Sequence, residues 1–250
     1  MDKIFIFDVD GTLTPSRLPM TKKFQTFFKQ WVKKNKFYLV TGSDFPKIQE
    51  QLSDDILELS EAIFTCCGNQ MWREGNTKQW PTNFISVYDN KFEMTTKLKN
   101  SLEVMLMSSQ YKHRYGNHIE DRGSMINFSV VGRNCTQEQR DEYYKWDLEK
   151  GERRKMSIFL KNKFKDLDAV IGGQISIDIY PKGNDKSQVL NVIEQERLVP
   201  PSEYIFIGDG IENGGNDYPL AKLMDLKDNC SSYHTTGWKQ TQKILENLID

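Results

Sequence analysis

The chain has 250 residues, enough for one large domain or two moderate ones, each with its own hydrophobic core. Its residues are 38% hydrophobic and 28% charged, as in an ordinary soluble globular protein. The formal net charge is −1, so no general field attracts nucleic acid or a membrane surface, and we expect neither as a partner.

Targeting and redox signals are few. The first residues lack the pattern of a secretory signal or transit peptide, and no apolar run is long enough to span a bilayer. The four cysteines, Cys66, Cys67, Cys135 and Cys230, show no Cys-x-x-Cys spacing and do not cluster in sequence with the three histidines. We therefore expect free thiols, no zinc site and a cytoplasmic location.

The first part of the chain alternates between strand and helix patterns. In chain order we expect a buried strand at Lys3–Phe7, a helix at Met20–Lys34, a strand at Phe37–Val40, a helix at Phe45–Leu52 and a strand at Ala62–Thr65. This alternation predicts a parallel α/β sheet.

The middle of the chain, from about Pro81 to Asp185, loses this alternation. The expected elements are a helix at Met94–Met107, a strand at Ser124–Val131, a charged helical segment at Gln137–Lys165 that breaks near Gly151, and a strand at Ile175–Tyr180. Alternation then resumes with a helix at Lys186–Glu196, a strand at Tyr204–Ile207 and a helix from Trp238. We therefore predict a Rossmann-like parallel-sheet core of residues 1–80 and 186–250, with an inserted α+β cap domain of residues 81–185.

Two carboxylates stand directly after the first strand, in Asp8-Val9-Asp10-Gly11-Thr12. Ligands of open α/β sheets bind at the carboxyl ends of the strands, and Gly11 lets the chain turn there. Many isolated stretches of this kind are only helix caps or acidic turns. After a buried strand, we expect Asp8 to act as a nucleophile towards phosphorus and Asp10 to donate and accept the proton.

A turn rich in Gly, Asp and Asn follows the strand Tyr204–Ile207. Magnesium prefers oxygen ligands and retains several waters, so carboxylates from different strands are enough to hold it. We predict a Mg²⁺ site made by Asp8, the backbone carbonyl of Asp10 and Asp209, with Asp217 at the end of the same turn as a further ligand. The metal would offset the repulsion between these carboxylates and a phosphate.

Candidate phosphate ligands follow the second strand and the predicted insertion. Thr41 and Ser43 offer hydroxyl groups, and the helix that begins after Asp44 offers backbone N–H donors. Lys186 offers a cation at the start of the next helix. A lone surface lysine is normally just solvated, so Lys186 matters only in combination with the carboxylates.

These motifs resemble the haloacid dehalogenase (HAD) superfamily of phosphotransferases and, within it, the eukaryotic-type phosphomannomutases. The wider resemblance rests on Asp8–Thr12. The narrower one rests on Asp8–Arg17, Gly42–Leu52, Arg122–Arg140, Gly172–Lys186 and Gly214–Asp217. The long loop from Asp209 to Asp217 is also similar to that of phosphomannomutases, whereas related sugar-phosphate phosphatases have a compact turn. The resemblance implies a HAD-like core with a cap.

The resemblance also implies substrate-binding residues. In the family, cap arginines bind the distal phosphate of a hexose bisphosphate, and their neighbours contact phosphate and sugar hydroxyls. Arginine suits this task because its planar fork pairs with two phosphate oxygens. The matching residues here are Arg17, Arg122, Asn127, Arg133, Arg140, Ser176 and Asp178.

The reaction that the resemblance implies is a Mg²⁺-dependent phosphoryl transfer between mannose 6-phosphate and mannose 1-phosphate. Hexose 1,6-bisphosphate would be the activator that phosphorylates Asp8, and a hexose phosphate would be the small-molecule partner. Such an enzyme serves mannose metabolism and GDP-mannose biosynthesis. The family also pairs through its caps, which implies a homodimer.

Two other functions remain open from the sequence. One is a sugar-phosphate phosphatase of the same superfamily, and the other is a catalytically silent sugar-phosphate-binding protein on the same fold. The chain departs from the family pattern at Cys66–Gln70, at Thr41, at Asn184 and in the metal loop at Gly210–Asn213. The first departure lies near the hinge between core and cap, where poorer closure would admit water and favour hydrolysis.

Overall fold

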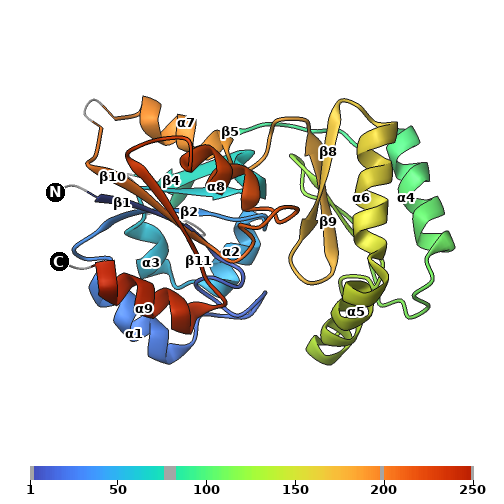
Figure 1. Ribbon diagram of the computed structural model, residues 1–250, viewed down its shortest axis with the longest axis horizontal. Helices are drawn as coiled ribbons and strands as arrows, with labels where there is room; N and C mark the ends of the chain where they lie inside the picture. The colour runs from blue at the N-terminus through green and yellow to red at the C-terminus, as the bar shows by residue number, and fades with distance from the viewer. Residues whose placement is uncertain (1–2, 76–82, 198–199, 249–250) are drawn as a thin grey trace. The chain divides into compact units, whose positions relative to one another are not determined.

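A computed structural model describes residues 3–75, 83–197 and 200–248 and divides the chain into two compact units (Figure 1). The core comprises Met1–Asp89 and Asp185–Asp250, and the cap comprises Asn90–Asn184. The cap therefore begins later than residue 81, where we placed its start. The reason is β5, Phe84–Asp89, which pairs with the core sheet and was not expected from the sequence.

The core sheet has seven strands in the order β11-β10-β1-β2-β3-β4-β5. The five from β11 to β3 are mutually parallel, which confirms the expected Rossmann-like core. They are β1 (Lys3–Asp8), β2 (Lys36–Val40), β3 (Ala62–Thr65), β10 (Glu203–Gly208) and β11 (Cys230–His234). The last two, β4 (Gln70–Glu74) and β5, are antiparallel and complete one edge.

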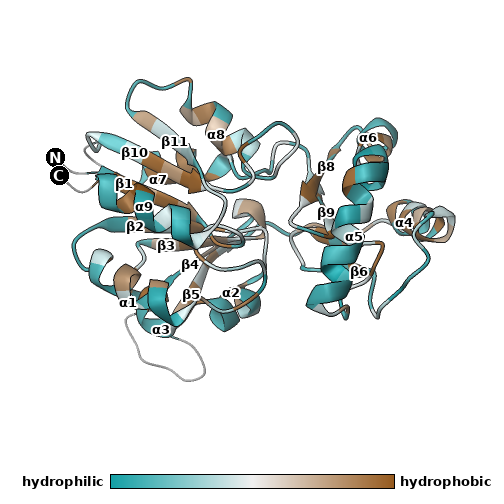
Figure 2. Cartoon of the chain, turned by 60° about the horizontal axis from the view of Figure 1, so that its bottom comes forward, coloured by the Kyte–Doolittle hydropathy of each residue, from teal (hydrophilic) through white to brown (hydrophobic). Residues whose placement is uncertain are grey.

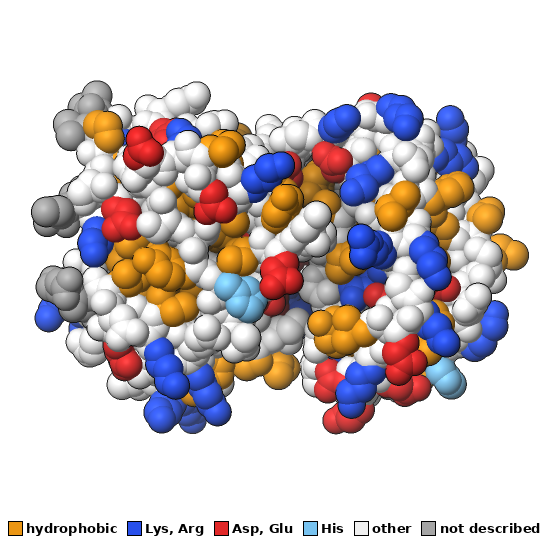
Figure 3. Space-filling model, viewed as in Figure 1, with side chains coloured by type: hydrophobic (Ala, Val, Ile, Leu, Met, Phe, Trp, Pro, Cys, Tyr) orange, Lys and Arg blue, Asp and Glu red, His pale blue; other side chains and the backbone are white. Residues whose placement is uncertain are grey.

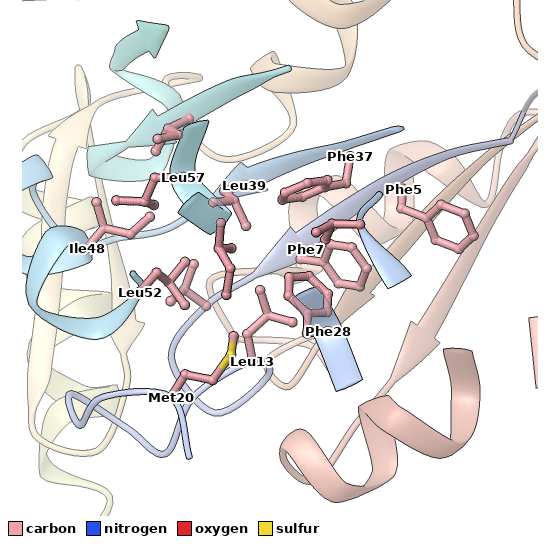
Figure 4. Close-up of a cluster of buried hydrophobic side chains, with 14 of the residues drawn as sticks. Phe5, Phe7, Leu13, Met20, Phe28, Phe37, Leu39, Ile48, Leu52 and Leu57 are labelled. Carbon is pink, nitrogen blue, oxygen red and sulfur yellow. The ribbon is translucent and has the colours of Figure 1, made fainter. Parts of the chain in front are cut away.

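Helices cover both faces of the core sheet because the strand side chains are apolar on both sides. Phe5 and Phe7 of β1 pack on one face in a cluster that includes residues of α1, α2, α3 and α9 (Figure 4). Ile4 and Ile6 alternate to the other face, where α7 and α8 pack. The core helices are α1 (Lys22–Trp31), α2 (Phe45–Gln51), α3 (Asp54–Glu58), α7 (Gln188–Gln195), α8 (Tyr218–Met224) and α9 (Trp238–Leu248).

The cap contains an antiparallel sheet in the order β6-β7-β9-β8 and three helices. Its strands are β6 (Ile119–Asp121), β7 (Ile126–Ser129), β8 (Leu167–Gly172) and β9 (Ser176–Pro181), and its helices are α4 (Thr96–Ser108), α5 (Gln137–Lys150) and α6 (Glu152–Lys163). The helix break predicted near Gly151 is confirmed, since this glycine adopts a left-handed conformation with φ 62° between α5 and α6.

The two faces of the cap sheet differ in character. Ile126 and Phe128 of β7 pack with Ile177 and Ile179 of β9 in the apolar cluster that the cap helices complete. The residues that alternate with them along the two strands are polar, namely Asn127, Ser129, Ser176 and Asp178, and all four are buried. Alternation along each strand therefore gives the sheet one apolar face and one polar face.

Surface properties agree with the small net charge. Acidic and basic side chains are interspersed on the face shown in Figure 3, and Figure 2 shows hydrophobic residues along central strands of the core sheet such as β1 and β10. Among the described residues, no helix combines the length and the apolar composition needed to cross a bilayer. All four cysteines are free thiols, as expected.

Candidate active site

Asp8 is the last residue of β1, the strand between β10 and β2 in the sheet. Its side chain is buried, and its two oxygens have different partners. Thr12 Oγ1 donates a hydrogen bond of 3.1 Å to Oδ2, and Lys186 Nζ donates one of 2.6 Å to Oδ1. The turn after β1 and the segment before α7 therefore fix the orientation of this carboxylate.

Lys186 is fully buried and lies between two carboxylates. Its ammonium group is 2.6 Å from Asp8 Oδ1 and 2.6 Å from Asp217 Oδ1. Burial alone would lower the pKa of Lys186, but attraction to Asp217 and Asp8 outweighs that effect and raises it well above its usual value. The lysine therefore stays charged, and the structure places it in direct contact with two of the carboxylates.

Three carboxylates meet around this lysine. Oxygens of Asp8, Asp209 and Asp217 all lie within 4.8 Å of one another. Burial, together with the nearby Asp217 charge, raises the pKa of Asp209 to about 7, although its side chain still reaches solvent. Burial also raises the pKa of Asp8, although the attraction of Lys186 works to lower it. One ammonium group does not balance three carboxylates, and such a cluster of oxygen donors fits a hard divalent cation such as Mg²⁺.

Glycine at position 11 is required for this arrangement. Its φ is 81°, and a Cβ atom added there would lie 2.3 Å from Asp209 Oδ2. Any side chain would therefore collide with the carboxylate as well as strain the backbone. Asp217 is held by the backbone in turn, since Gly210 N donates a 2.9 Å hydrogen bond to its Oδ2. Both oxygens of Asp217 thus already accept hydrogen bonds.

The Asp10 carboxylate makes a separate set of contacts. Ser43 Oγ donates to its Oδ2 at 3.1 Å, while Gln51 Nε2 (2.9 Å) and the backbone N–H of Arg17 donate to its Oδ1. Arg17 has φ 61°, an uncommon left-handed conformation for a residue other than glycine. These three donors fix the orientation of the Asp10 carboxylate.

The residues expected to bind phosphate after β2 are already engaged with one another. Thr41 Oγ1 accepts a hydrogen bond of 3.0 Å from Ser43 N, and the Ser43 hydroxyl donates its hydrogen bond to Asp10. The first turn of α2 is capped by Asp44, whose Oδ1 accepts from Lys47 N at 3.2 Å. The free helix N–H donors that we expected there are therefore partly occupied, and by a carboxylate that would repel an anion.

Sequence reasoning missed Gln51. This residue is buried at the end of α2 and donates to both Asp10 Oδ1 and Thr14 Oγ1. The available signal was an amide at a position where the helix pattern requires an apolar side chain. Such a buried amide needs hydrogen-bond partners, and the polar side chains of the turn after β1 provide them.

The turn at Cys66–Gly68 lies against the start of α7. Cys66, Cys67 and Gly68 all have positive φ values, and the first two pay a steric cost for this conformation. Gln188 Nε2 donates a 3.0 Å hydrogen bond to the carbonyl of Cys67, and a Cβ atom on Gly68 would lie 2.7 Å from Val189 Cγ2. This departure from the family pattern therefore supports the segment that carries Lys186.

The cap residues expected to bind substrate lie on and around the polar face of its sheet. Asn127 and Asp178 are directly opposite each other in β7 and β9, and Asn127 Nδ2 donates a 2.6 Å hydrogen bond to Asp178 Oδ1. Arg133 Nη1 donates to Ser176 Oγ at 2.9 Å. Arg122 follows β6, and Arg140 is buried near the start of α5.

Lys186→Met tests the buried cluster. The substitution leaves Asp8 and Asp217 without their shared cation, so we expect the free energy of unfolding at pH 8 to fall by about 3–5 kcal/mol. Because burial raises the pKa of Asp8, this carboxylate can take up a proton in acid, so the loss should be smaller at pH 5. Urea denaturation measures both values, with Lys243→Met, at an exposed position of α9, as the control. An equal loss in both variants would contradict the assignment.

Magnesium binding should depend on pH through Asp209. Below a pH of about 7 this carboxyl group holds a proton that the metal must displace, so the affinity should fall as the pH drops through that value. We expect the rise in melting temperature caused by a fixed Mg²⁺ concentration to be larger at pH 8 than at pH 6, and to disappear in Asp209→Asn. A rise that is independent of pH would refute this role of Asp209.

Known proteins similar to this chain agree with the geometry. The family model described as eukaryotic phosphomannomutase matches residues 24–250. A phosphomannomutase of Encephalitozoon cuniculi is 37% identical over 89% of this chain and 86% of its own length. A phosphomannomutase of Drosophila melanogaster is 35% identical over 99% of this chain and 95% of its own.

Solved structures show that the fold is shared more widely. A haloacid dehalogenase-like hydrolase from Bacteroides thetaiotaomicron superposes with a TM-score of 0.61 at 15% identity and covers all of both chains. An IMP-nucleotidase of Plasmodium falciparum gives a TM-score of 0.65 at 15% identity, over 99% of this chain and 66% of that one. The fold is therefore HAD-like with a cap, and the chain belongs to the eukaryotic phosphomannomutase family.

Proposed function

We propose that this protein interconverts mannose 6-phosphate and mannose 1-phosphate through a phosphoryl group carried on Asp8. Membership of the phosphomannomutase family supports the reaction. The observation that carries the mechanism is the buried Asp8–Lys186–Asp217 arrangement, which presents an oriented carboxylate beside a fixed cation. A sugar-binding module without catalysis has no need for such a group.

In the proposed reaction an oxygen of Asp8 attacks phosphorus. The new bond joins Asp8 to phosphorus, the bond from phosphorus to the sugar oxygen breaks, and Asp10 supplies the proton to that oxygen. In the return step Asp10 takes the proton from a sugar hydroxyl as this hydroxyl attacks the phosphorus on Asp8. Ser43 and Gln51 keep the Asp10 carboxylate in place for both steps.

Charge balance supports a bound Mg²⁺. Asp8, Asp209 and the carbonyl of Asp10 would hold the ion, which would supply positive charge against the phosphate and the carboxylates. Asp217, which we expected as a further ligand, offers an oxygen to the same cluster and also accepts hydrogen bonds from Lys186 and Gly210. Its proposed part is therefore to bind the ion and to hold Lys186 and the metal loop in position.

The cap residues would bind the far end of the substrate. Arg122, Arg133 and Arg140 suit a second phosphate, because each guanidinium offers several donors with full positive charge. Asn127, Ser176 and Asp178 would contact sugar hydroxyls, and Arg17 would assist from the core. Hexose 1,6-bisphosphate fits as the activator because it carries one phosphate for Asp8 and one for the cap arginines.

A phosphatase of the same superfamily is the second candidate. The departure at Cys66–Gln70 favours it only if the cap closes poorly, so that water reaches the phosphorylated Asp8. The free thiols support a reducing compartment such as the cytoplasm for either enzyme.

Phosphorus NMR separates these functions. The protein is mixed with Mg²⁺, mannose 1-phosphate and a trace of glucose 1,6-bisphosphate, and the phosphorus signals are followed with time. We expect mannose 6-phosphate to appear. Release of inorganic phosphate alone would support the phosphatase, and an unchanged spectrum would support a silent binding protein.

Asp8→Asn tests the nucleophile. An amide cannot form the phosphorylated intermediate, so we expect turnover to fall by roughly a thousandfold or more. Because burial already disfavours the Asp8 charge, its loss should leave the melting temperature unchanged or higher. Asp54→Asn, on the exposed surface of α3, is the matched control. Substantial turnover in Asp8→Asn would exclude this residue as the nucleophile.

A homodimer through the cap is also part of this proposal. Several large apolar side chains of the cap helices are exposed, namely Val104, Met107, Leu148, Ile158 and Phe159. Covering such side chains is a common reason for association. We expect analytical ultracentrifugation to show a dimer that Phe159→Glu dissociates, whereas Lys165→Glu should have no effect. A monomeric wild-type protein at micromolar concentration would contradict the dimer.

A further inference from the structure

One acidic side chain lies among the cap arginines and has no part in the function proposed so far. Glu120 is the middle residue of β6, directly opposite Asn127 of β7. Its Oε2 accepts from Arg122 Nε at 3.0 Å and from Arg122 Nη2 at 2.5 Å, and lies 3.5 Å from Arg133 Nε. A single carboxylate oxygen therefore joins the two guanidinium groups.

The energetic reason for this contact is the burial of two like charges. The side chains of Arg122 and Arg133 are only 4% and 7% exposed, whereas that of Glu120 is 35% exposed. Two guanidinium groups that are mostly removed from water repel each other unless an anion lies between them. Glu120 supplies that anion from the strand itself and is present whether or not a ligand is bound.

The contacts also leave donors available on one of these arginines. Arg133 Nη1 donates a hydrogen bond to Ser176 Oγ, and Glu120 lies beside Arg133 Nε. Within the described part of the chain, Arg133 Nη2 is buried and has no hydrogen-bond partner. A buried donor of this kind needs an acceptor, and a phosphate oxygen is a suitable one.

We propose that Glu120 is a positioning residue that holds Arg122 and Arg133 as a preformed pair for the second phosphate of the substrate. The proposal rests on the proposed function, since it concerns the phosphate at the cap end of the hexose. Glu120 does not touch the reacting atoms. It fixes the separation and direction of two guanidinium groups before the ligand arrives, so that the unpartnered Nη2 of Arg133 is ready to bind it.

The opposite role for Glu120, competition with the phosphate for the two arginines, gives a different experimental result. A carboxylate beside two arginines can also compete with an incoming phosphate, in which case its removal would tighten binding. Glu120→Gln separates the two roles because glutamine has the same shape but no charge. A positioning role predicts weaker binding in this variant, and competition predicts stronger binding.

The experiment compares Glu120→Gln with the wild-type protein and with Glu149→Gln, an exposed glutamate of α5 in the same cap. We expect KM for mannose 1-phosphate to rise about tenfold in Glu120→Gln, as when an orienting partner is removed from a ligand-binding group. Hydrolysis of p-nitrophenyl phosphate should be unchanged, because this compound has no second phosphate. The melting temperature should be lower than that of Glu149→Gln, because the two buried guanidinium groups lose the anion between them, whereas unchanged p-nitrophenyl phosphate hydrolysis shows that the fold and the core site are intact.

Glu120→Asp keeps the charge but withdraws the carboxylate, so its KM should lie between those of the wild type and Glu120→Gln. An unchanged or lower KM in Glu120→Gln, or a parallel loss of p-nitrophenyl phosphate hydrolysis, would overturn the proposal. If the wild-type protein only hydrolyses its substrate, the proposed function fails separately. KM for the hydrolysis of glucose 1,6-bisphosphate, which still offers a phosphate to the cap, is then compared among the same variants.

Discussion

The buried ammonium group of Lys186 is the interaction on which the core depends. It connects the end of β1 with the loop after β10, because Asp8 and Asp217 both accept hydrogen bonds from it at 2.6 Å. Without this cation, the carboxyl ends of two neighbouring parallel strands would carry uncompensated negative charge in a protein interior. The same cation keeps one oxygen of Asp8 fixed, so the contact that permits the fold also prepares the chemistry.

The core and the cap balance charge in opposite ways. In the core, carboxylates outnumber the buried cation, and the cluster has a deficit of positive charge that suits a metal ion. In the cap, arginines outnumber Glu120, and the cluster has an excess of positive charge that suits a phosphate. Each unit therefore has an incomplete charge balance that a ligand of the opposite sign completes.

Much of this arrangement was predictable from the sequence, because it follows from strong local patterns. The apolar run before Asp8 predicted a buried strand, and the position of Asp8 at its carboxyl end indicated a ligand site there. The edge strand β4 was missed because Gln70–Glu74 is too polar to read as a buried strand and acquires its conformation from pairing. The contact of Gln51 with Asp10 was missed because the two residues are 41 positions apart. The contact of Glu120 with Arg133 was missed because it joins two segments that only the folded cap brings together, although Arg122 lies close in sequence.

The discontinuous core has a consequence for how the chain folds during synthesis. The cap is one continuous segment, Asn90–Asn184, so all its strands and helices are available before the last part of the core is made. β1 pairs with β10 on one side, and Lys186 is 178 residues from Asp8. On the ribosome, the edge of β1 that later pairs with β10 therefore stays unpaired while the cap is translated. Because the sequence of β1 is apolar, the risk of aggregation is greatest during that interval.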